Sequence, residues 1–204
     1  FVFLAYGTTS VVARQFGAGS RRGALETGVG GVWLAGGLGV LAALVVGLAA
    51  RPLAHAFGSS PAALDEAVVY LRISALGLPA MLLVLAATGI LRGLQDTRTP
   101  LAVATLGFGA NAVLSVVLVL GLDLGIGGAA WGTVIAQWGM AVALLGVVLR
   151  EGRAAGASLR PHVGRVAAAA LDGVPLLVRT LALRAVILLT VATNVLLPSL
   201  EEVG

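Results

Sequence analysis

The stretch LGIGGAAWGTVIAQWGMAVALLGVVL, residues 124–149, decides the fold of this protein because it contains no charged side chain. A helix needs about 20 predominantly apolar residues to cross the hydrocarbon core of a bilayer, whereas a membrane-spanning β-strand needs only about 10. Residues 27–50 and 99–122 are equally free of charge. We therefore predict transmembrane helices from these three stretches alone.

The composition of the whole chain favours the same environment. Of its 204 residues, 59% are hydrophobic and only 11% are charged, whereas a typical soluble domain has about 25% charged residues. The chain therefore has too few polar side chains to cover a water-soluble globule. In lipid, only helices and closed barrels satisfy their backbone hydrogen bonds, and the long apolar runs favour helices. The prediction is an all-α polytopic membrane protein.

The apolar residues group into six segments separated by short polar connections. The predicted segments are about 1–16, 24–50, 65–92, 100–121, 127–149 and 166–195. The chain begins with Phe1 inside the first segment rather than with Met, so we expect it to be a piece of a longer protein.

Arginine is distributed unevenly over the connections. The second and fourth connections hold only Arg51. The first, third and fifth connections, with their flanks, hold nine of the 13 basic residues, all of which are arginines: Arg14, Arg21, Arg22, Arg92, Arg98, Arg150, Arg153, Arg160 and Arg165.

Arginine near the end of a span marks the cytoplasmic face of a membrane protein. We therefore predict that residues 17–23, 93–99 and 150–165 face the cytoplasm, and that residues 51–64 and 121–127 face outside. The same rule accounts for the net charge of +4. We expect this positive charge to interact with the lipid bilayer and not with a nucleic acid.

Polar side chains inside the predicted spans are candidates for function, because polar groups are costly at membrane depth. Asn111 and Ser115 are four residues apart, and so are Thr133 and Gln137, so each pair shares one face of its helix. Two helices that each present a polar pair could line one cavity. Alternatively, these groups act only as hydrogen bonds between neighbouring helices.

Other residues in the spans add to this set. Tyr70 and Thr88 lie in the third segment, and Arg184 lies deep in the sixth, where it either lines a water-filled cavity or extends towards the membrane boundary. Pro79 and Pro175 each remove a backbone hydrogen bond and predict kinks, which serve either bending or ordinary packing.

The sequence offers little for enzymatic chemistry. It contains no cysteine, and its two histidines, His55 and His162, fall on opposite sides of the predicted membrane. There is no paired carboxylate within a span, no cluster of metal ligands and no P-loop or nucleophile elbow. We therefore expect no catalytic residue, no bound metal and no organic cofactor.

Several loops resemble those of the multidrug and toxic compound extrusion (MATE) family, in particular its DinF-like branch. The matching motifs, in chain order, are VVARQFGAGSR (11–21), YLRI (70–73) with GLP (77–79), LRGLQDTRTPL (91–101), GAA (128–130) with Thr133 and Gln137, and RTLALR (179–184). The turn residues that carry the match are Gly17, Gly19, Arg92, Gly93, Asp96, Thr97, Arg98, Thr99 and Pro100. The ordered set covers nearly the whole chain.

This resemblance implies that the chain corresponds to helices two to seven of a twelve-helix transporter with two six-helix lobes. Residues 1–150 would form an incomplete N-terminal lobe, residues 151–165 the cytoplasmic inter-lobe loop, and residues 166–204 the truncated first helix of the C-terminal lobe. It also implies a bacterial plasma-membrane protein that works as a monomer. Such a protein exports organic, often cationic, compounds in exchange for protons or sodium ions by alternating access.

The resemblance also assigns a site. In DinF-like members the N-lobe site uses an Asp on the first helix, which would precede Phe1, and an Asn and an Asp one turn apart on the fifth helix. The latter positions fall on Asn111 and Ser115, while a Thr and a Tyr of the family fall on Thr133 and Tyr70. A serine hydroxyl neither releases nor takes up a proton at accessible pH, and it is a neutral ligand for a cation. We therefore expect coupling to protons rather than to sodium.

Two alternatives stay open at this point. A flippase for lipid-linked oligosaccharides, from the same superfamily, would present more charge in a large central groove. A membrane-embedded enzyme or a non-transporting assembly subunit would carry its functional residues elsewhere in the longer protein.

Overall fold

The computed structural model describes residues 2–56, 61–161 and 163–201, and every regular element within these ranges is helical. The elements are α1 (Val2–Gly17), α2 (Arg21–Leu48), α3 (Ala50–Ala56), α4 (Pro61–Ala75), α5 (Leu78–Gly93), α6 (Arg98–Val116), the π-helical turn η1 (Val117–Gly121), α7 (Gly125–Ala154) and α8 (Val163–Glu201). The predicted all-α architecture is confirmed.

Five helical stretches are long and apolar enough to cross a membrane. They are Arg21–Leu48, Ala63–Gly93, Arg98–Gly121, Gly125–Ala154 and Val163–Thr190. Large apolar side chains such as Leu101, Leu106 and Leu120 are exposed on these stretches. Such a surface suits contact with lipid or with further helices, since neither demands polar groups from the side chains.

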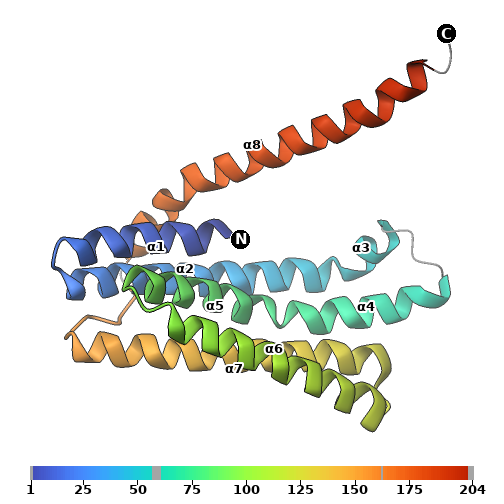
Figure 1. Cartoon of the computed structure of the whole chain (residues 1–204). Coiled ribbons are helices and arrows are strands. Elements are labelled where there is room, and N and C mark those ends of the chain that lie inside the picture. The colour runs from blue at the N-terminus through green and yellow to red at the C-terminus, as the bar shows by residue number, and fades with distance from the viewer. Residues whose placement is uncertain (1, 57–60, 162, 202–204) are drawn as a thin grey trace.

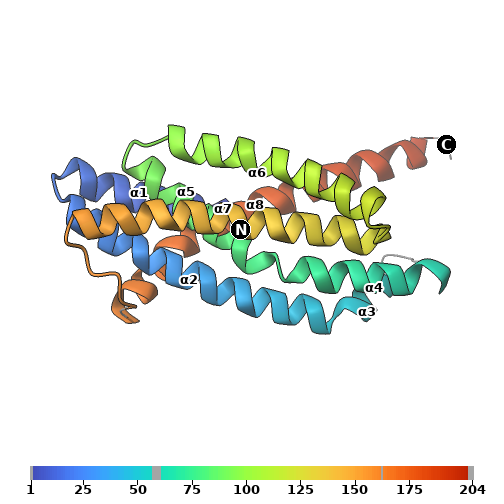
Figure 2. The same cartoon turned by 90° about the horizontal axis from the view of Figure 1, so that it is seen from below.

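From α1 to α7 the helices run lengthwise beside one another, and the chain reverses direction between successive long stretches, with α4 and α5 together forming one of these stretches (Figures 1 and 2). The connections α1–α2, α5–α6 and α7–α8 lie at one end of the bundle, and α3 and η1 lie at the other (Figure 1). An ion pair between Arg21 and Glu151 joins the start of α2 to the last turns of α7 at the first of these ends. The arginine-bearing connections are therefore gathered on one side, while their exposure to the cytoplasm stays a prediction.

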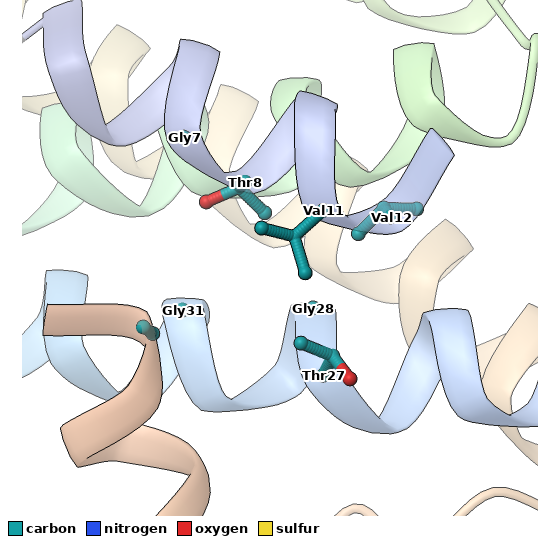
Figure 3. A pocket seen from close by; sticks show the side chains of 8 residues that line it. Gly7, Thr8, Val11, Val12, Thr27, Gly28 and Gly31 are labelled. Carbon is teal, nitrogen blue, oxygen red and sulfur yellow. The ribbon is translucent and has the colours of Figure 1, made fainter. Parts of the chain in front are cut away.

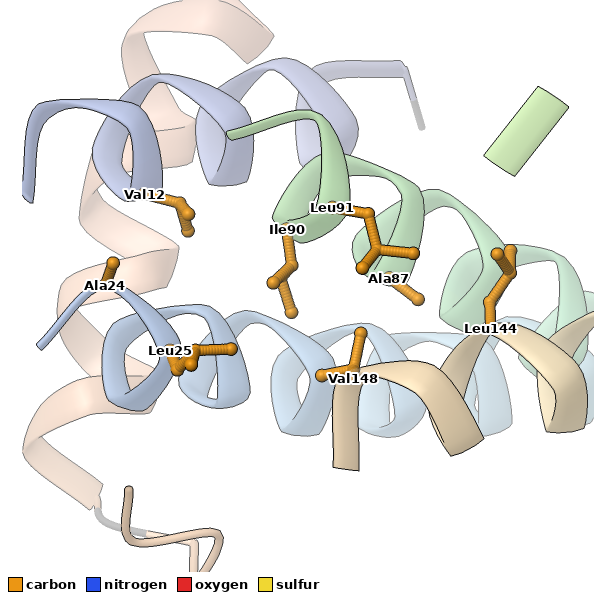
Figure 4. Packing of buried hydrophobic residues seen from close by; sticks show 8 residues of the cluster. All are labelled: Val12, Ala24, Leu25, Ala87, Ile90, Leu91, Leu144 and Val148. Carbon is orange, nitrogen blue, oxygen red and sulfur yellow. The ribbon is translucent and has the colours of Figure 1, made fainter. Parts of the chain in front are cut away.

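The largest buried cluster lies near the arginine-bearing end (Figure 4). It contains Val12 of α1, Leu25 of α2, Leu91 of α5 and Val148 of α7, together with Ala24, Ala87, Ile90 and Leu144. Each of these residues is at most 2% exposed. Four helices therefore share one apolar core at this end of the bundle.

The predicted third segment is not one continuous helix. The structure breaks it at residues 76–77, between α4 and α5. Pro79 has no backbone N–H to offer the carbonyl of Ala75, and its ring crowds that carbonyl, so a break before it is favoured. At the second position of α5 the missing N–H costs nothing, and a new helix begins there. We predicted a kink at Pro79, and the structure has a break in the helix two to three residues before it.

Other boundaries also differ from the expected ones. Residues 51–64, predicted as a loop, contain most of α3 and the start of α4. The helix α7 extends to Ala154 and α8 begins at Val163, which shortens the last connection. Pro175 lies inside α8, and the helix continues through it without a break.

We expect the substitution Gly39→Ala to reduce the free energy of unfolding by about 1–3 kcal/mol, as overpacking of a core typically does. A Cβ at Gly39 would lie 2.5 Å from the Cα of Pro79, and a backbone atom cannot move aside locally. Gly37→Ala is the matched control, because no atom lies within 4 Å of its Cβ position. Thermal unfolding in detergent measures both variants, and equal losses would contradict this packing.

Candidate functional site

The polar residues of α6 and α7 form one hydrogen-bonded group. Ser115 Oγ donates to Oδ1 of Asn111 at 3.2 Å. Thr133 Oγ1 lies 3.3 Å from the same Asn111 oxygen and 3.1 Å from the carbonyl oxygen of Ala129, so its single proton is shared between two acceptors. All three side chains are partly buried.

These hydrogen bonds determine which polar atoms of the group can still bind a ligand. The two hydroxyl groups approach the oxygen of the Asn111 amide, and in the part of the chain that the structure describes no acceptor bonds to the amide NH₂, which can therefore donate hydrogen bonds to a ligand. Gly132 allows the approach of the two helices, because a Cβ there would lie 3.0 Å from the backbone nitrogen of Ser115. The group is neutral, since none of its side chains ionises at accessible pH.

An apolar groove of about 330 Å³ adjoins this group between α6 and α7. Ala110 and Leu114 of α6 and Ala136 and Met140 of α7 are among its walls. Its volume falls in the range of sites that take small organic molecules, about 300–1,000 Å³. The groove walls are apolar side chains and glycine, which suit the apolar body of an organic molecule, and the polar group lies at neighbouring positions of the same two helices.

A second pocket, between α1, α2 and α8, is far too small for such a ligand (Figure 3). Its volume is about 20 Å³, and Thr8, Thr27, Gly28 and Gly31 are among its walls. That space holds about one water molecule. We place the candidate site at α6 and α7 because the hydrogen-bonded polar group lies there.

Gln137 does not join the Asn111 group, although it lies one turn from Thr133 on α7. Its amide oxygen packs so closely on Gly77 that a Cβ there would collide with it. The neighbouring Trp138 donates its Nε1–H to the carbonyl oxygen of Leu76 at 3.1 Å. Consecutive turns of α7 thus contact the polar group and the break between α4 and α5.

Sequence reasoning missed Trp138, and one signal could have found it. An indole N–H inside a span needs an acceptor, and a helix that ends at a glycine–proline break exposes carbonyl oxygens that lack helical partners. The pair formed by Trp138 and Leu76 satisfies both requirements. Only the fold, however, shows that α7 lies beside this break.

The remaining predicted residues stand apart from the group. Tyr70 is exposed on α4, Thr88 is partly buried on α5, and Arg184 is exposed on α8. In the part of the chain that the structure describes, no hydrogen bond links these three side chains to Asn111. Arg184 belongs to the portion of α8 that extends away from the bundle (Figure 1). The structure therefore does not bring it to the α6–α7 site.

The turn motifs cap helices rather than form a pocket. Gly19 has a φ of +80°, which ends α1 in the left-handed conformation favoured by glycine, and Ser20 accepts from the N–H of Gly23 at the start of α2. In the α5–α6 turn, Oδ1 of Asp96 accepts from the N–H of Thr99 at 3.0 Å. Hydrogen bonds from Thr99 hold the pKa of Asp96 below its ordinary value of 3.8.

We expect Asp96→Ala to cost about 0.5–2 kcal/mol of stability at neutral pH, as the loss of a helix cap does. Because the folded-state pKa is lowered, the carboxylate stabilises the fold above about pH 5, and this stabilisation is lost as the pH falls below 3.8. The difference between wild type and variant should therefore narrow in acid. Unfolding curves at several pH values measure it.

Thr97→Ala is the control for this variant, because the Thr97 side chain makes no capping hydrogen bond. We expect it to change the stability little at any pH. If Thr97→Ala and Asp96→Ala were equally destabilising, the cap would not be the cause.

Comparison with known proteins decides the family. The model of the MatE family matches residues 1–117, more than half of the chain. The chain belongs to the MatE family. With its five candidate spans, it is a multi-pass membrane protein.

Individual relatives agree with this assignment. The chain is 36% identical over 148 residues to the DNA damage-inducible protein F of Escherichia coli (strain K12), covering 72% of this chain and 32% of that protein. It is 31% identical over 147 residues to the probable multidrug resistance protein NorM of Pseudomonas putida, covering 70% of this chain and 31% of that protein. The resemblance to the DinF-like branch is thereby confirmed.

A solved structure supports the fold. A multidrug resistance MATE family transporter of the MOP superfamily, in an inward-facing conformation, superposes with a TM-score of 0.71 at 25% identity. The match covers 85% of this chain and 40% of that chain. The MATE-like arrangement of the helices is thus shown, and the chain spans about a third of the length of the curated relatives.

Proposed function

We propose that this chain forms part of a secondary active transporter that exports organic, often cationic, compounds by alternating access. Membership of the MatE family and the names of the relatives support a transporter. The observation that carries the proposal is the group at Asn111, where hydroxyls from two membrane-spanning helices meet one amide oxygen beside an apolar groove of about 330 Å³.

The chemistry of this group suits recognition of an organic molecule without fixing its charge. The Asn111 amide NH₂ offers donors, the hydroxyls of Ser115 and Thr133 can rotate to donate or accept, and the groove walls bury apolar carbon. A cation would still require a carboxylate for charge compensation. We propose that this acid comes from a part of the protein outside this chain, as the family resemblance implies.

We also propose coupling to protons rather than to sodium, because Ser115 offers a cation a neutral ligand where the family resemblance implies a carboxylate. Asn111, Ser115 and Thr133 cannot release or take up a proton at accessible pH, so these residues can only orient the group that does. One charge moved across the membrane gains about 2.3 kcal/mol per 100 mV. We propose a proton antiporter of the bacterial plasma membrane that acts as a monomer and requires no cofactor.

The flippase alternative finds less support. A flippase for charged lipid-linked sugars calls for charged groups in the groove, whereas the groove between α6 and α7 is lined by apolar side chains and glycine in the part of the chain that the structure describes.

We expect Asn111→Ala, in the complete protein that contains this chain, to lower export of an organic cation such as ethidium by roughly 5- to 150-fold. This range corresponds to about 1–3 kcal/mol for buried groups that lose their partner. Thr105→Ala is the matched control on the same helix, because Thr105 is exposed and bonds only to the carbonyl of Leu101. Efflux from loaded proteoliposomes measures both, and equal losses would contradict the assignment of the site.

The coupling ion is tested in the same vesicles by imposing either a pH gradient or a sodium gradient. We expect the pH gradient alone to drive export by the wild type. Export that followed only the sodium gradient would overturn proton coupling while leaving the transport function intact.

A further inference from the structure

One face of α2 holds the connection between α7 and α8. Glu26, Gly30 and Trp33 follow one another at intervals of four and three residues and therefore lie on the same side of the helix. Each of them contacts the chain between Ser158 and Arg165. We call these three residues the α2 seat.

Glu26 makes the strongest contacts of the seat. Its Oε1 accepts from the backbone N–H of Ser158 at 3.1 Å, and its Oε2 lies 3.1 Å from Nη2 of Arg165. Arg22, on the same helix, donates Nε–H to Oε1 at 3.1 Å. The Glu26 side chain is only 18% exposed. Charge-assisted bonds with so little exposure are stronger than ordinary surface pairs.

Gly30 and Trp33 add contacts that do not depend on charge. A Cβ at Gly30 would lie 2.9 Å from the backbone oxygen of Arg165, so only glycine allows the first turn of α8 to come this close to α2. Trp33 donates its Nε1–H to the carbonyl oxygen of Leu159 at 3.4 Å. The α2 seat therefore contacts both the connection that precedes α8 and the first turn of α8.

The rest of α8 has much weaker support. The helix contacts α1 and α2, and beyond its first turns it extends obliquely away from the bundle (Figure 1). Leu171 and Val178 are 71% and 59% exposed. Its direction in the described part of the chain is therefore set where it starts, at the contacts of Arg165 and its neighbours.

We infer that the α2 seat fixes the origin of α8 and that Glu26 is a positioning residue for transport. The inference rests on the proposed function, in which α8 begins the second lobe and the two lobes move against each other. Rigid-body movements of domains turn about a few loop or element-terminal residues, and the start of α8 lies at such a position between the two lobes. Loss of the Glu26 contacts frees the start of α8 and uncouples the movement of the lobes.

Distances between spin labels test this placement in the complete protein that contains this chain, reconstituted in nanodiscs. The labels are attached by Leu101→Cys on α6 and Val178→Cys on α8, both exposed. We expect a narrow distance distribution for the parent protein. Glu26→Ala and Arg165→Gln should broaden it, and Arg165→Lys should restore much of the narrow distribution because the charge is retained.

Three further variants distinguish loss of the α2 seat contacts from a general loss of stability. Gly30→Ala should broaden the distribution without any change in charge, whereas Gly37→Ala, with no atom within 4 Å of its Cβ position, should not. Arg22→Gln removes a Glu26 partner from α2 itself and should leave the distribution narrow. If Glu26→Ala fails to fold, Gly30→Ala and Arg165→Gln decide the question.

Export of ethidium is measured for the same variants at equal protein levels. Reduced export together with a broadened distribution supports the positioning role. A narrow distribution in both Glu26→Ala and Gly30→Ala overturns the inference, and so does equal broadening by Arg22→Gln. Absence of export by the parent protein, with the distance changes as expected, would refute the proposed function but not the seat.

Discussion

A backbone carbonyl in lipid must find a hydrogen-bond donor within the protein, because the hydrocarbon core contains no water to supply one. Continuous helices meet this requirement by themselves. The break between α4 and α5 does not, and there the indole N–H of Trp138 donates to the carbonyl of Leu76. Helix α7 supplies this donor from its place beside α4 and α5, and the candidate site at Thr133 lies on the same helix.

Much of the fold could be predicted because its signals are local. The uncharged stretch 124–149 is sufficient to predict a spanning helix, and the four-residue spacing of Asn111 and Ser115 places both on one face. Their bonds to each other and to Thr133 follow once α6 packs on α7. For Arg184, by contrast, the apolar segment left open either a cavity or the membrane boundary, and only the fold shows that the side chain is exposed on α8, a helix that contacts α1 and α2.

The contacts that could not be predicted depend on segments distant in sequence. Nothing local to Glu26 indicates that a carboxylate there would bind Ser158 and Arg165, more than 130 residues later in the chain. Gly30 illustrates the same limit, since glycines are frequent in this sequence and only the backbone of α8 shows which one must be glycine. The sequence shows which residue types are present, but their contact partners can be identified only when the packing of whole helices is known.

The double contact of α7 has a thermodynamic consequence. Thr133 touches Asn111 on one neighbour, and Trp138, little more than one turn further on, touches Leu76 on another. A rotation or slide of α7 therefore strains both bonds together. A ligand that tightens the first contact is therefore expected to stiffen the break between α4 and α5, and by reciprocity a rigid break raises the affinity for that ligand.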